Sequence, residues 1–175
     1  MWVTEEGPAE VSRSTGYQES SEPKPGYRLC VGIFLIGPGR TVFVGQRRDT
    51  REPAWQMPQG GIDPGETPLQ AAFRELHEEI GTDRATFIRE SGIWRSYDLP
   101  APIAERMWNG RYRGQTQKWV ALRFFGRDAD IVLDTAHAEF SAWRWASVDE
   151  VVDLAISFKR CVYLSVVDEF RHLLV

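Results

Sequence analysis

The sequence has few cysteines, no long hydrophobic run and no recognisable export signal. Its 175 residues include two cysteines, Cys30 and Cys161, which are too few and too widely separated for a disulfide framework. The longest apolar stretch, residues 30–36, is far shorter than the ~20 residues that a membrane-spanning helix needs. No basic segment followed by an apolar one opens the chain. These absences predict a cytoplasmic protein with no membrane partner.

Positive charge is also scarce. The formal net charge of −4 excludes the broad basic surface of a general nucleic-acid binder, so we expect no DNA partner. Of the 21 cationic side chains, three are lysines and the other 18 are arginines. A guanidinium can bind phosphate through two parallel hydrogen bonds. Codon usage in a GC-rich genome is the simpler explanation for the excess of arginine.

The length fits one domain of about 100–200 residues, preceded by a polar segment. Residues 1–25 are rich in Glu, Ser, Pro and Gly and are predicted to form a disordered or loosely attached tail. Residues 26–170 are predicted to form the domain, of class α+β. Its predicted strands cover residues 29–36, 41–46, 85–97, 118–125 and 140–145, and residues 99–113 form an irregular excursion. Its helices lie between the cap Thr67 and the stop Gly81, after the cap Ser147, and from the cap Ser157 to about residue 173.

Three glutamates lie on one face of the helix predicted between residues 67 and 81. With 3.6 residues per turn, Glu75, Glu78 and Glu79 share an arc of about 100°. Like-charged neighbours at these spacings each cost about 0.2–0.5 kcal/mol, and the helix dipole disfavours anions near the C-terminus. A solvated acidic face is the ordinary explanation for such a pattern. A divalent cation such as Mg²⁺ or Mn²⁺, which prefers carboxylate oxygens, is the alternative.

The loop before this helix favours the metal site. Residues 60–82 resemble the 23-residue box of the Nudix hydrolase family. The resemblance implies an α/β/α sandwich around a mixed β-sheet, with the box as loop–helix–loop. It also implies hydrolysis of a phosphoanhydride bond in a nucleoside diphosphate linked to another group. The matching residues are Gly60, Glu66, Arg74, Glu75, Leu76, Glu78, Glu79 and Gly81 in the pattern G-x5-E-x7-R-E-U-x-E-E-x-G-U, where U is aliphatic and Thr82 departs from it.

The resemblance further implies the roles of individual residues. It implies Mg²⁺, with Mn²⁺ as a possible substitute, as two or more ions. Arg74 and Glu66 are the expected orienting residues. Glu75, Glu79 and Glu139 are the expected catalytic residues, with Glu75 and Glu139 as rival general bases. The expected metal ligands are Glu75, Glu78, Glu79, Glu139 and the backbone carbonyl near Gly60.

Five further segments resemble the bacterial RNA pyrophosphohydrolases, also described as dinucleoside polyphosphate hydrolases. They are residues 26–28, 55–62, 114–119, 139–145 and 157–160. Phe158 offers a ring on which a base could stack, although a buried hydrophobic contact is an equal alternative. The substrate contacts expected from these segments are Arg28, Arg48, Gln117, Lys118, Phe158 and Lys159.

The leading hypothesis is removal of pyrophosphate from 5′-triphosphorylated RNA. Cleavage of diadenosine tetraphosphate or another dinucleoside polyphosphate is the alternative within the same chemistry. A non-catalytic Nudix-fold nucleotide-binding module belongs to another class and is disfavoured, because all three box glutamates are present. Nucleophile-elbow, P-loop and dinucleotide-binding motifs are absent from the sequence, which argues against those other chemistries.

Overall fold

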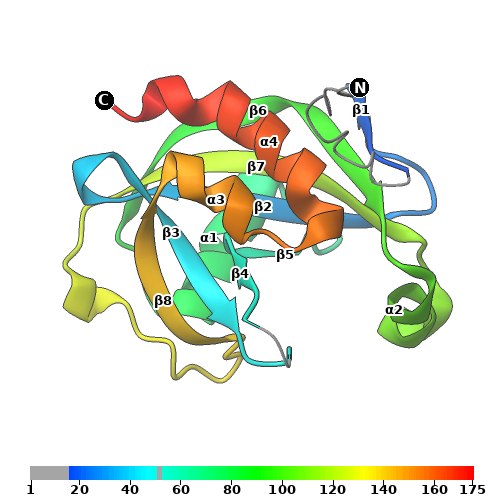
Figure 1. The fold of residues 1–175 in the computed structure, drawn as a ribbon, viewed down its shortest axis with the longest axis horizontal. Helices are drawn as coiled ribbons and strands as arrows, with labels where there is room; N and C mark the ends of the chain where they lie inside the picture. The colour runs from blue at the N-terminus through cyan, green and yellow to red at the C-terminus, as the bar shows by residue number, and fades with distance from the viewer. Residues whose placement is uncertain (1–15, 51–52) are drawn as a thin grey trace, which may run out of the picture.

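The computed structural model describes residues 16–50 and 53–175. In this part of the chain, one eight-stranded sheet has helices on both faces (Figure 1). The strands are β1 (Gln18–Ser20), β2 (Arg28–Ile36), β3 (Thr41–Arg47), β4 (Trp55–Gln56), β5 (Gln59–Gly61), β6 (Ala85–Asp98), β7 (Gly114–Phe124) and β8 (Phe140–Ser147). The α-helices are α1 (Pro68–Ile80), α2 (Ala101–Arg106), α3 (Val148–Leu154) and α4 (Arg160–Phe170).

The sheet is mixed. Its main strand order is β1-β6-β7-β2-β3-β4, with β5 paired to β2 and β8 paired to β3. The central pair β2–β7 is parallel over nine residue pairs, whereas the other pairings are antiparallel. The prediction of an α+β fold around a mixed sheet is confirmed.

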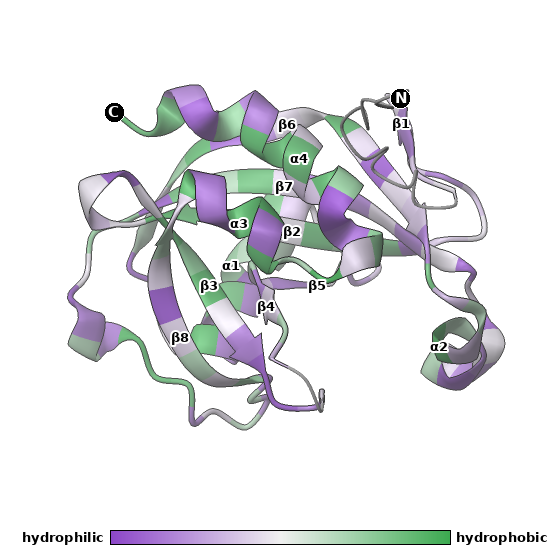
Figure 2. Ribbon diagram, viewed as in Figure 1, coloured by the Kyte–Doolittle hydropathy of each residue, from purple (hydrophilic) through white to green (hydrophobic). Residues whose placement is uncertain are grey.

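Strand β2 lies at the centre of two hydrophobic cores. Its side chains alternate between the faces of the sheet. Ile33 and Leu35 pack on the α1 side, whereas Phe34 and Ile36 pack on the side that α3 and α4 cover. A strand buried on both faces is a continuous apolar run, and Figure 2 shows the central strand β2 as largely hydrophobic.

Helix α1 begins and ends at the predicted residues. The Thr67 hydroxyl accepts a hydrogen bond from the backbone N–H of Gln70 (3.2 Å), and the Gln70 side chain accepts one from the N–H of Thr67 (2.9 Å). Gly81 ends the helix at φ +69°, in the left-handed region that glycine adopts without steric cost. These local signals hold the box helix against the sheet.

The structure differs from the prediction at both ends of the chain. Residues 18–20, predicted as part of the tail, form β1 and pair with β6, because strand pairing uses the backbone and needs no apolar side chain. Residues 1–15 of the predicted tail lie outside the described residues. The prediction that Ser157 caps the last helix is wrong: Ser157 begins a short 3-10 turn, and α4 starts at Arg160 without a side-chain cap.

The excursion at residues 99–113 is more ordered than predicted. It contains α2 and a 3-10 turn at Met107–Gly110, and it projects from one end of the sheet in Figure 1. The backbone N–H of Leu99 donates to the carbonyl of Arg113 (3.0 Å), which closes the base of the excursion. No helix of the described residues combines the length and apolar character that a membrane span would require.

Candidate active site

Helix α1 directs two of its glutamates into the protein. Glu75 and Glu79 are buried, and Glu79 is only 1% exposed, whereas Glu78 is half-buried. Leu76 and Ile80 pack into the core beside them. Because residues four apart lie one above the other on a helix, burying the apolar stripe brings Glu75 and Glu79 to the same side of α1.

Arg74 connects the box loop to this helix. Its guanidinium donates to both carboxylate oxygens of Glu66 (2.7 and 2.8 Å) and to the carbonyl of Gly61 (2.7 Å). It also donates to Glu75 (2.8 Å) and to Glu78 (3.4 Å). The Arg74 hydrogen bonds hold the pKa of Glu66 below its usual value. Arg74 therefore determines where the loop carboxylate and two of the helix carboxylates lie.

The negative charge of Glu79 is only weakly compensated, because the positive charge of Lys159 lowers its pKa less than burial raises it. Both of its carboxylate oxygens are buried without a hydrogen-bond partner among the described residues. Burial raises the pKa of Glu79 well above its usual value, and the negative charges of Glu139 and Glu75 add to this effect. Burial also raises the pKa of Glu75, against the opposing effect of Arg74. Desolvation likewise raises the pKa of Glu139.

The donor chemistry of this group fits a hard divalent cation. An unpartnered buried carboxylate is costly unless a cation or a proton neutralises it, and oxygen ligands suit Mg²⁺ and Mn²⁺. In residues 16–50 and 53–175, however, no three acidic, histidine or cysteine side chains are grouped closely enough to hold a metal ion. Arg74 binds one oxygen of Glu75 and one oxygen of Glu78, which leaves the other oxygen of each carboxylate for a metal ion.

Gly60 lies directly against one of the carboxylates. A Cβ atom at this position would lie 1.9 Å from the Cδ of Glu75. No side chain can occupy that space, because non-bonded carbon atoms pack at about 3.5–4.0 Å. The glycine therefore lets the backbone of β5 approach Glu75, as a carbonyl ligand near Gly60 would require.

The carboxylates line one cavity of about 220 Å³, which we call the carboxylate cavity. Glu139 reaches it from the segment before β8, where its carbonyl accepts a hydrogen bond from the backbone N–H of Arg48 (3.0 Å). Two arginines, Arg28 and Arg47, line the same cavity. The cavity thus combines four carboxylates with two cations, drawn from segments far apart in the sequence. Its other lining residues are Gln59, Gly60, Gly61, Met107, Trp108, Gln115 and His137.

A second cavity of about 550 Å³, the aromatic cavity, shares four lining residues with the first. The rings of Tyr97 and Phe158 stack at its wall, with centroids 6.1 Å apart. Gln56 also lines it, and the Gln56 Nε2 atom is buried without a hydrogen-bond partner among the described residues. The residues that line both cavities are Arg47, Gln59, Met107 and Gln115.

Lys159 lines the aromatic cavity as a buried cation. It is 5% exposed, and its Nζ donates to the side-chain oxygens of Gln56 (2.9 Å) and Gln59 (3.2 Å). Burial, assisted by the positive charge of Arg47, lowers the pKa of Lys159 to about 7. The negative charge of Glu79 opposes this shift. An anionic ligand in the cavity would restore the charged form of the lysine.

We expect Lys159→Met to change how stability depends on pH. Below about pH 7 the wild-type protein buries a charged lysine. Between pH 7 and the ordinary pKa of 10.5, the unfolded state binds the extra proton, so wild-type stability rises with pH. The stability of the variant relative to wild type should therefore fall by about 1.4 kcal/mol per pH unit in this window. Urea unfolding of both proteins at pH 6, 8 and 10 measures this difference in the free energy of unfolding. A difference that does not change with pH would contradict the lowered pKa of Lys159.

The structure does not bring all the predicted substrate contacts to these cavities. Arg28 lines the carboxylate cavity, and Phe158 and Lys159 line the aromatic cavity. The remaining three line neither. Arg48 is exposed, Gln117 is buried in hydrogen bonds with Gln59, Gln115 and Trp119, and the ammonium of Lys118 lies over the Trp94 ring (5.5 Å) and 4.0 Å from Glu90.

Sequence reasoning missed several residues of the carboxylate cavity, of which Arg47 and Trp108 matter most for its chemistry. Arg47, adjacent to the predicted Arg48, lines both cavities, and strand alternation decides which neighbour faces inward. Trp108 enters from the excursion at residues 99–113. The adjacent arginines at positions 47 and 48 could have indicated Arg47 as an alternative to Arg48. No local sequence pattern indicates Trp108.

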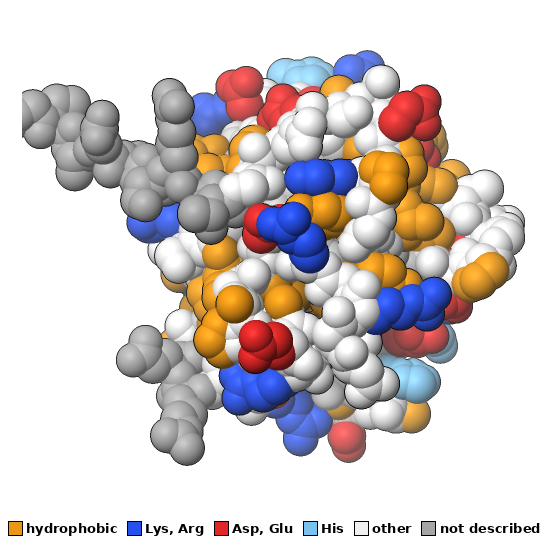
Figure 3. Space-filling view, turned by 90° about the vertical axis from the view of Figure 1, so that its right-hand side faces the viewer, with side chains coloured by type: hydrophobic (Ala, Val, Ile, Leu, Met, Phe, Trp, Pro, Cys, Tyr) orange, Lys and Arg blue, Asp and Glu red, His pale blue; other side chains and the backbone are white. Residues whose placement is uncertain are grey.

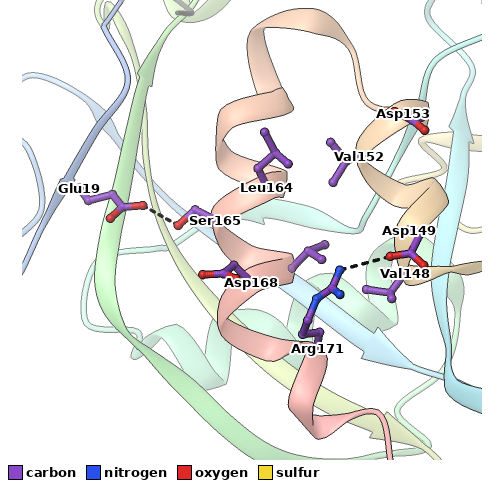
Figure 4. A pocket seen from close by; sticks show the side chains of 10 residues that line it. Glu19, Val148, Asp149, Val152, Asp153, Leu164, Ser165, Asp168 and Arg171 are labelled. Atoms are coloured by element: carbon purple, nitrogen blue, oxygen red, sulfur yellow. Dashed lines mark hydrogen bonds and ion pairs between the residues drawn. The ribbon is translucent and has the colours of Figure 1, made fainter. Parts of the chain in front are cut away.

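A separate groove lies between α3 and α4 and has different chemistry (Figure 4). Its volume is about 780 Å³, and acidic side chains outnumber the single arginine, Arg171, in its lining. Arg171 itself donates to Asp149 (3.2 Å). A surface of this sign repels a polyphosphate. The acidic residues of the groove are Glu19, Asp149, Asp153 and Asp168.

Known proteins resemble this chain over most of its length. An RNA pyrophosphohydrolase of Rhodospirillum rubrum is 57% identical over 143 residues, covering 82% of this chain and 86% of that protein. One of Rickettsia conorii is 50% identical over 148 residues, covering 85% and 92%. The solved dihydroneopterin triphosphate pyrophosphohydrolase of E. coli shares the fold at 23% identity, with a TM-score of 0.60, covering 82% of this chain and 98% of that one. The family model described as NUDIX domain matches residues 26–164. The chain therefore belongs to the NUDIX family.

Proposed function

We propose that this chain is a hydrolase that removes pyrophosphate from the 5′-triphosphate end of RNA. The observation that carries the proposal is that two neighbouring cavities share four lining residues, one cavity being lined by carboxylates and arginines and the other by stacked aromatic rings. The first suits a polyphosphate with metal ions, and the second suits a nucleobase. The two relatives that are 50% and 57% identical carry the name RNA pyrophosphohydrolase, which supports the same substrate.

NUDIX hydrolases generally need divalent metal ions, and we propose Mg²⁺, with Mn²⁺ as a substitute and two or more ions. Bound metal would shield the phosphate charge and make water more acidic. The unpartnered carboxylate of Glu79 supports a ligand role for it. The remaining proposed ligands are Glu75, Glu78, Glu139 and the carbonyl near Gly60.

The arginines of the carboxylate cavity would bind the phosphates. Arg28 and Arg47 both line it, and guanidinium groups bind phosphate oxygens through paired hydrogen bonds. Glu75 accepts a hydrogen bond from Arg74, which restrains its carboxylate. We therefore favour Glu139 over Glu75 as the general base, because a base must move a proton rather than remain tied to a cation.

The aromatic cavity would hold a nucleotide of the substrate. Phe158, which is half-buried and stacks on the buried ring of Tyr97, offers a ring face for stacking, which is worth about 1–3 kcal/mol per base. The unpartnered Nε2 of Gln56 and the Nζ of Lys159 are donors for base acceptor atoms. Figure 3 shows cationic and acidic side chains interspersed on one described face, without a broad basic area there. Substrate recognition would therefore depend on these cavities.

The decisive experiment compares kcat/KM for a short 5′-triphosphorylated RNA and for diadenosine tetraphosphate, with Mg²⁺ and with a chelator. We expect pyrophosphate release from the RNA, loss of turnover in the chelator and at least a ten-fold preference for RNA. A ten-fold preference for the dinucleotide would reverse the assignment in favour of dinucleoside polyphosphate hydrolysis. Tight binding of both ligands without turnover would indicate a binding module.

A further inference from the structure

We propose that Trp108 is a positioning residue that holds the guanidinium of Arg28 toward the substrate phosphates. The inference rests on the proposed function, in which Arg28 binds phosphate. Both residues line the carboxylate cavity, although they come from distant segments. Arg28 begins β2, whereas Trp108 belongs to the turn at Met107–Gly110 of the excursion.

The Arg28 guanidinium packs against the indole and against the backbone of the box. Its Cζ atom lies 5.0 Å from the centre of the Trp108 ring, within the range of a cation–π contact. A Cβ atom at Gly61 would lie 2.4 Å from the Arg28 Nη2 atom, so the guanidinium rests directly on this glycine. The two contacts restrict how the Arg28 side chain can turn.

Arg28 retains its hydrogen-bonding capacity for a ligand. Across residues 16–50 and 53–175, it forms no ion pair within 4.0 Å. Its guanidinium donates one weak hydrogen bond there, from Nη1 to the Cys30 sulfur (3.9 Å). An indole face orients a guanidinium without using its N–H groups. This arrangement keeps the arginine in place and leaves its donors for phosphate oxygens.

The backbone that presents the indole is strained. Trp108 and Asn109 have φ values of +49° and +55° and precede Gly110 at +69°. A bulky residue rarely adopts this left-handed region, and such outliers persist where the surrounding structure over-determines them. The backbone N–H of Arg111 donates to the Trp108 carbonyl (3.1 Å) and closes the turn. The turn thereby directs the indole at Arg28 rather than into solvent.

A double-mutant cycle tests this role. We expect Trp108→Ala to lower kcat/KM for 5′-triphosphorylated RNA about ten-fold, mainly through KM, with a smaller loss in Trp108→Phe, which keeps an aromatic face. If the indole acts through Arg28, adding Trp108→Ala to Arg28→Ala should cause no further loss. Independent, multiplicative losses in the double variant, or wild-type kinetics in Trp108→Ala, would overturn the proposal.

Binding of inorganic tripolyphosphate, measured by calorimetry in the full-length protein, gives a readout that does not depend on turnover. Trp108→Ala should weaken this binding in the wild-type background but not in Arg28→Ala. Trp108→Ala could weaken tripolyphosphate binding only when Arg28 is present, while the wild-type protein releases no pyrophosphate from RNA. In that case the proposed function fails and the positioning role stands. If wild type hydrolyses RNA and the cycle is additive, the positioning role fails alone.

Two control variants separate the contact from the stability of the excursion. Arg111 lies over Tyr112 with its Cζ 5.3 Å from the ring centre, in the same excursion but outside both cavity linings. Arg111→Ala should therefore leave kinetics unchanged. Glu105→Gln, at an exposed position of α2 outside both cavity linings, should likewise keep RNA turnover. A loss in Arg111→Ala as large as that in Trp108→Ala would show that the excursion, not the indole, determines activity.

Discussion

Replacing Glu79 with glutamine is expected to lower kcat on 5′-triphosphorylated RNA at least ~100-fold while stabilising the metal-free protein. The loss follows if this carboxylate holds metal that supplies several kcal/mol of transition-state stabilisation. The gain follows because Glu79 is 1% exposed and lacks a hydrogen-bond partner in the described part of the chain. Glutamine occupies the same space without the cost of burying a charge.

The stability half of this prediction is measured by thermal unfolding in chelator and in Mg²⁺. Removing about 1 kcal/mol of unfavourable burial would raise Tm by about 2–4 °C for a domain of this size. Mg²⁺ should raise the Tm of wild type, since a ligand of the folded state stabilises it, and should affect the variant much less. Glu105→Gln on the exposed side of α2 is the matched control. Retention of activity in Glu79→Gln would refute the metal-site assignment.

Gly60→Ala is expected to lower kcat about 100-fold by displacing a catalytic carboxylate. The new methyl group would meet the Glu75 carboxyl carbon at 1.9 Å, so the Glu75 side chain must leave its hydrogen bond with Arg74. A misplacement of about 1 Å in an active site can cost 10²-fold in rate. Overpacking should also cost about 1–3 kcal/mol of stability, which urea unfolding measures.

The location of the clash can be checked by a second substitution. In a Glu75→Ala background, Gly60→Ala should no longer destabilise the protein, because the side chain that it meets is absent. Gly92→Ala is the control, since a Cβ atom there has no atom within 4 Å and should leave both activity and stability near wild type. An equal loss of stability in both backgrounds would place the strain elsewhere in β5.

Local patterns predicted the box helix and the central strand well. A capping box and a terminal glycine act over a few residues, so Thr67, Gln70 and Gly81 bounded α1 before any tertiary contact was known. The helical period likewise placed Glu75 and Glu79 on one face. The same local reasoning failed at Ser157, where burial of Lys159 and the turn before α4 override the preference of serine for a cap.

The sequence by itself determined the family, the box and the glutamates of α1, because their spacing within one helix defines a face. The family resemblance also predicted Glu139 beside them, and the structure places it in the same cavity. Tertiary structure alone decided that Arg47 rather than Arg48 lines the cavities and that Trp108 meets Arg28. It also decided that residues 18–20 extend the sheet. These contacts depend on strand register and on the return path of a long excursion, and neither is encoded in the periodicity of any one segment. The low positive charge still argues against a broad basic surface. The cations of the proposed site are Arg28 and Arg47, which the fold places in the carboxylate cavity.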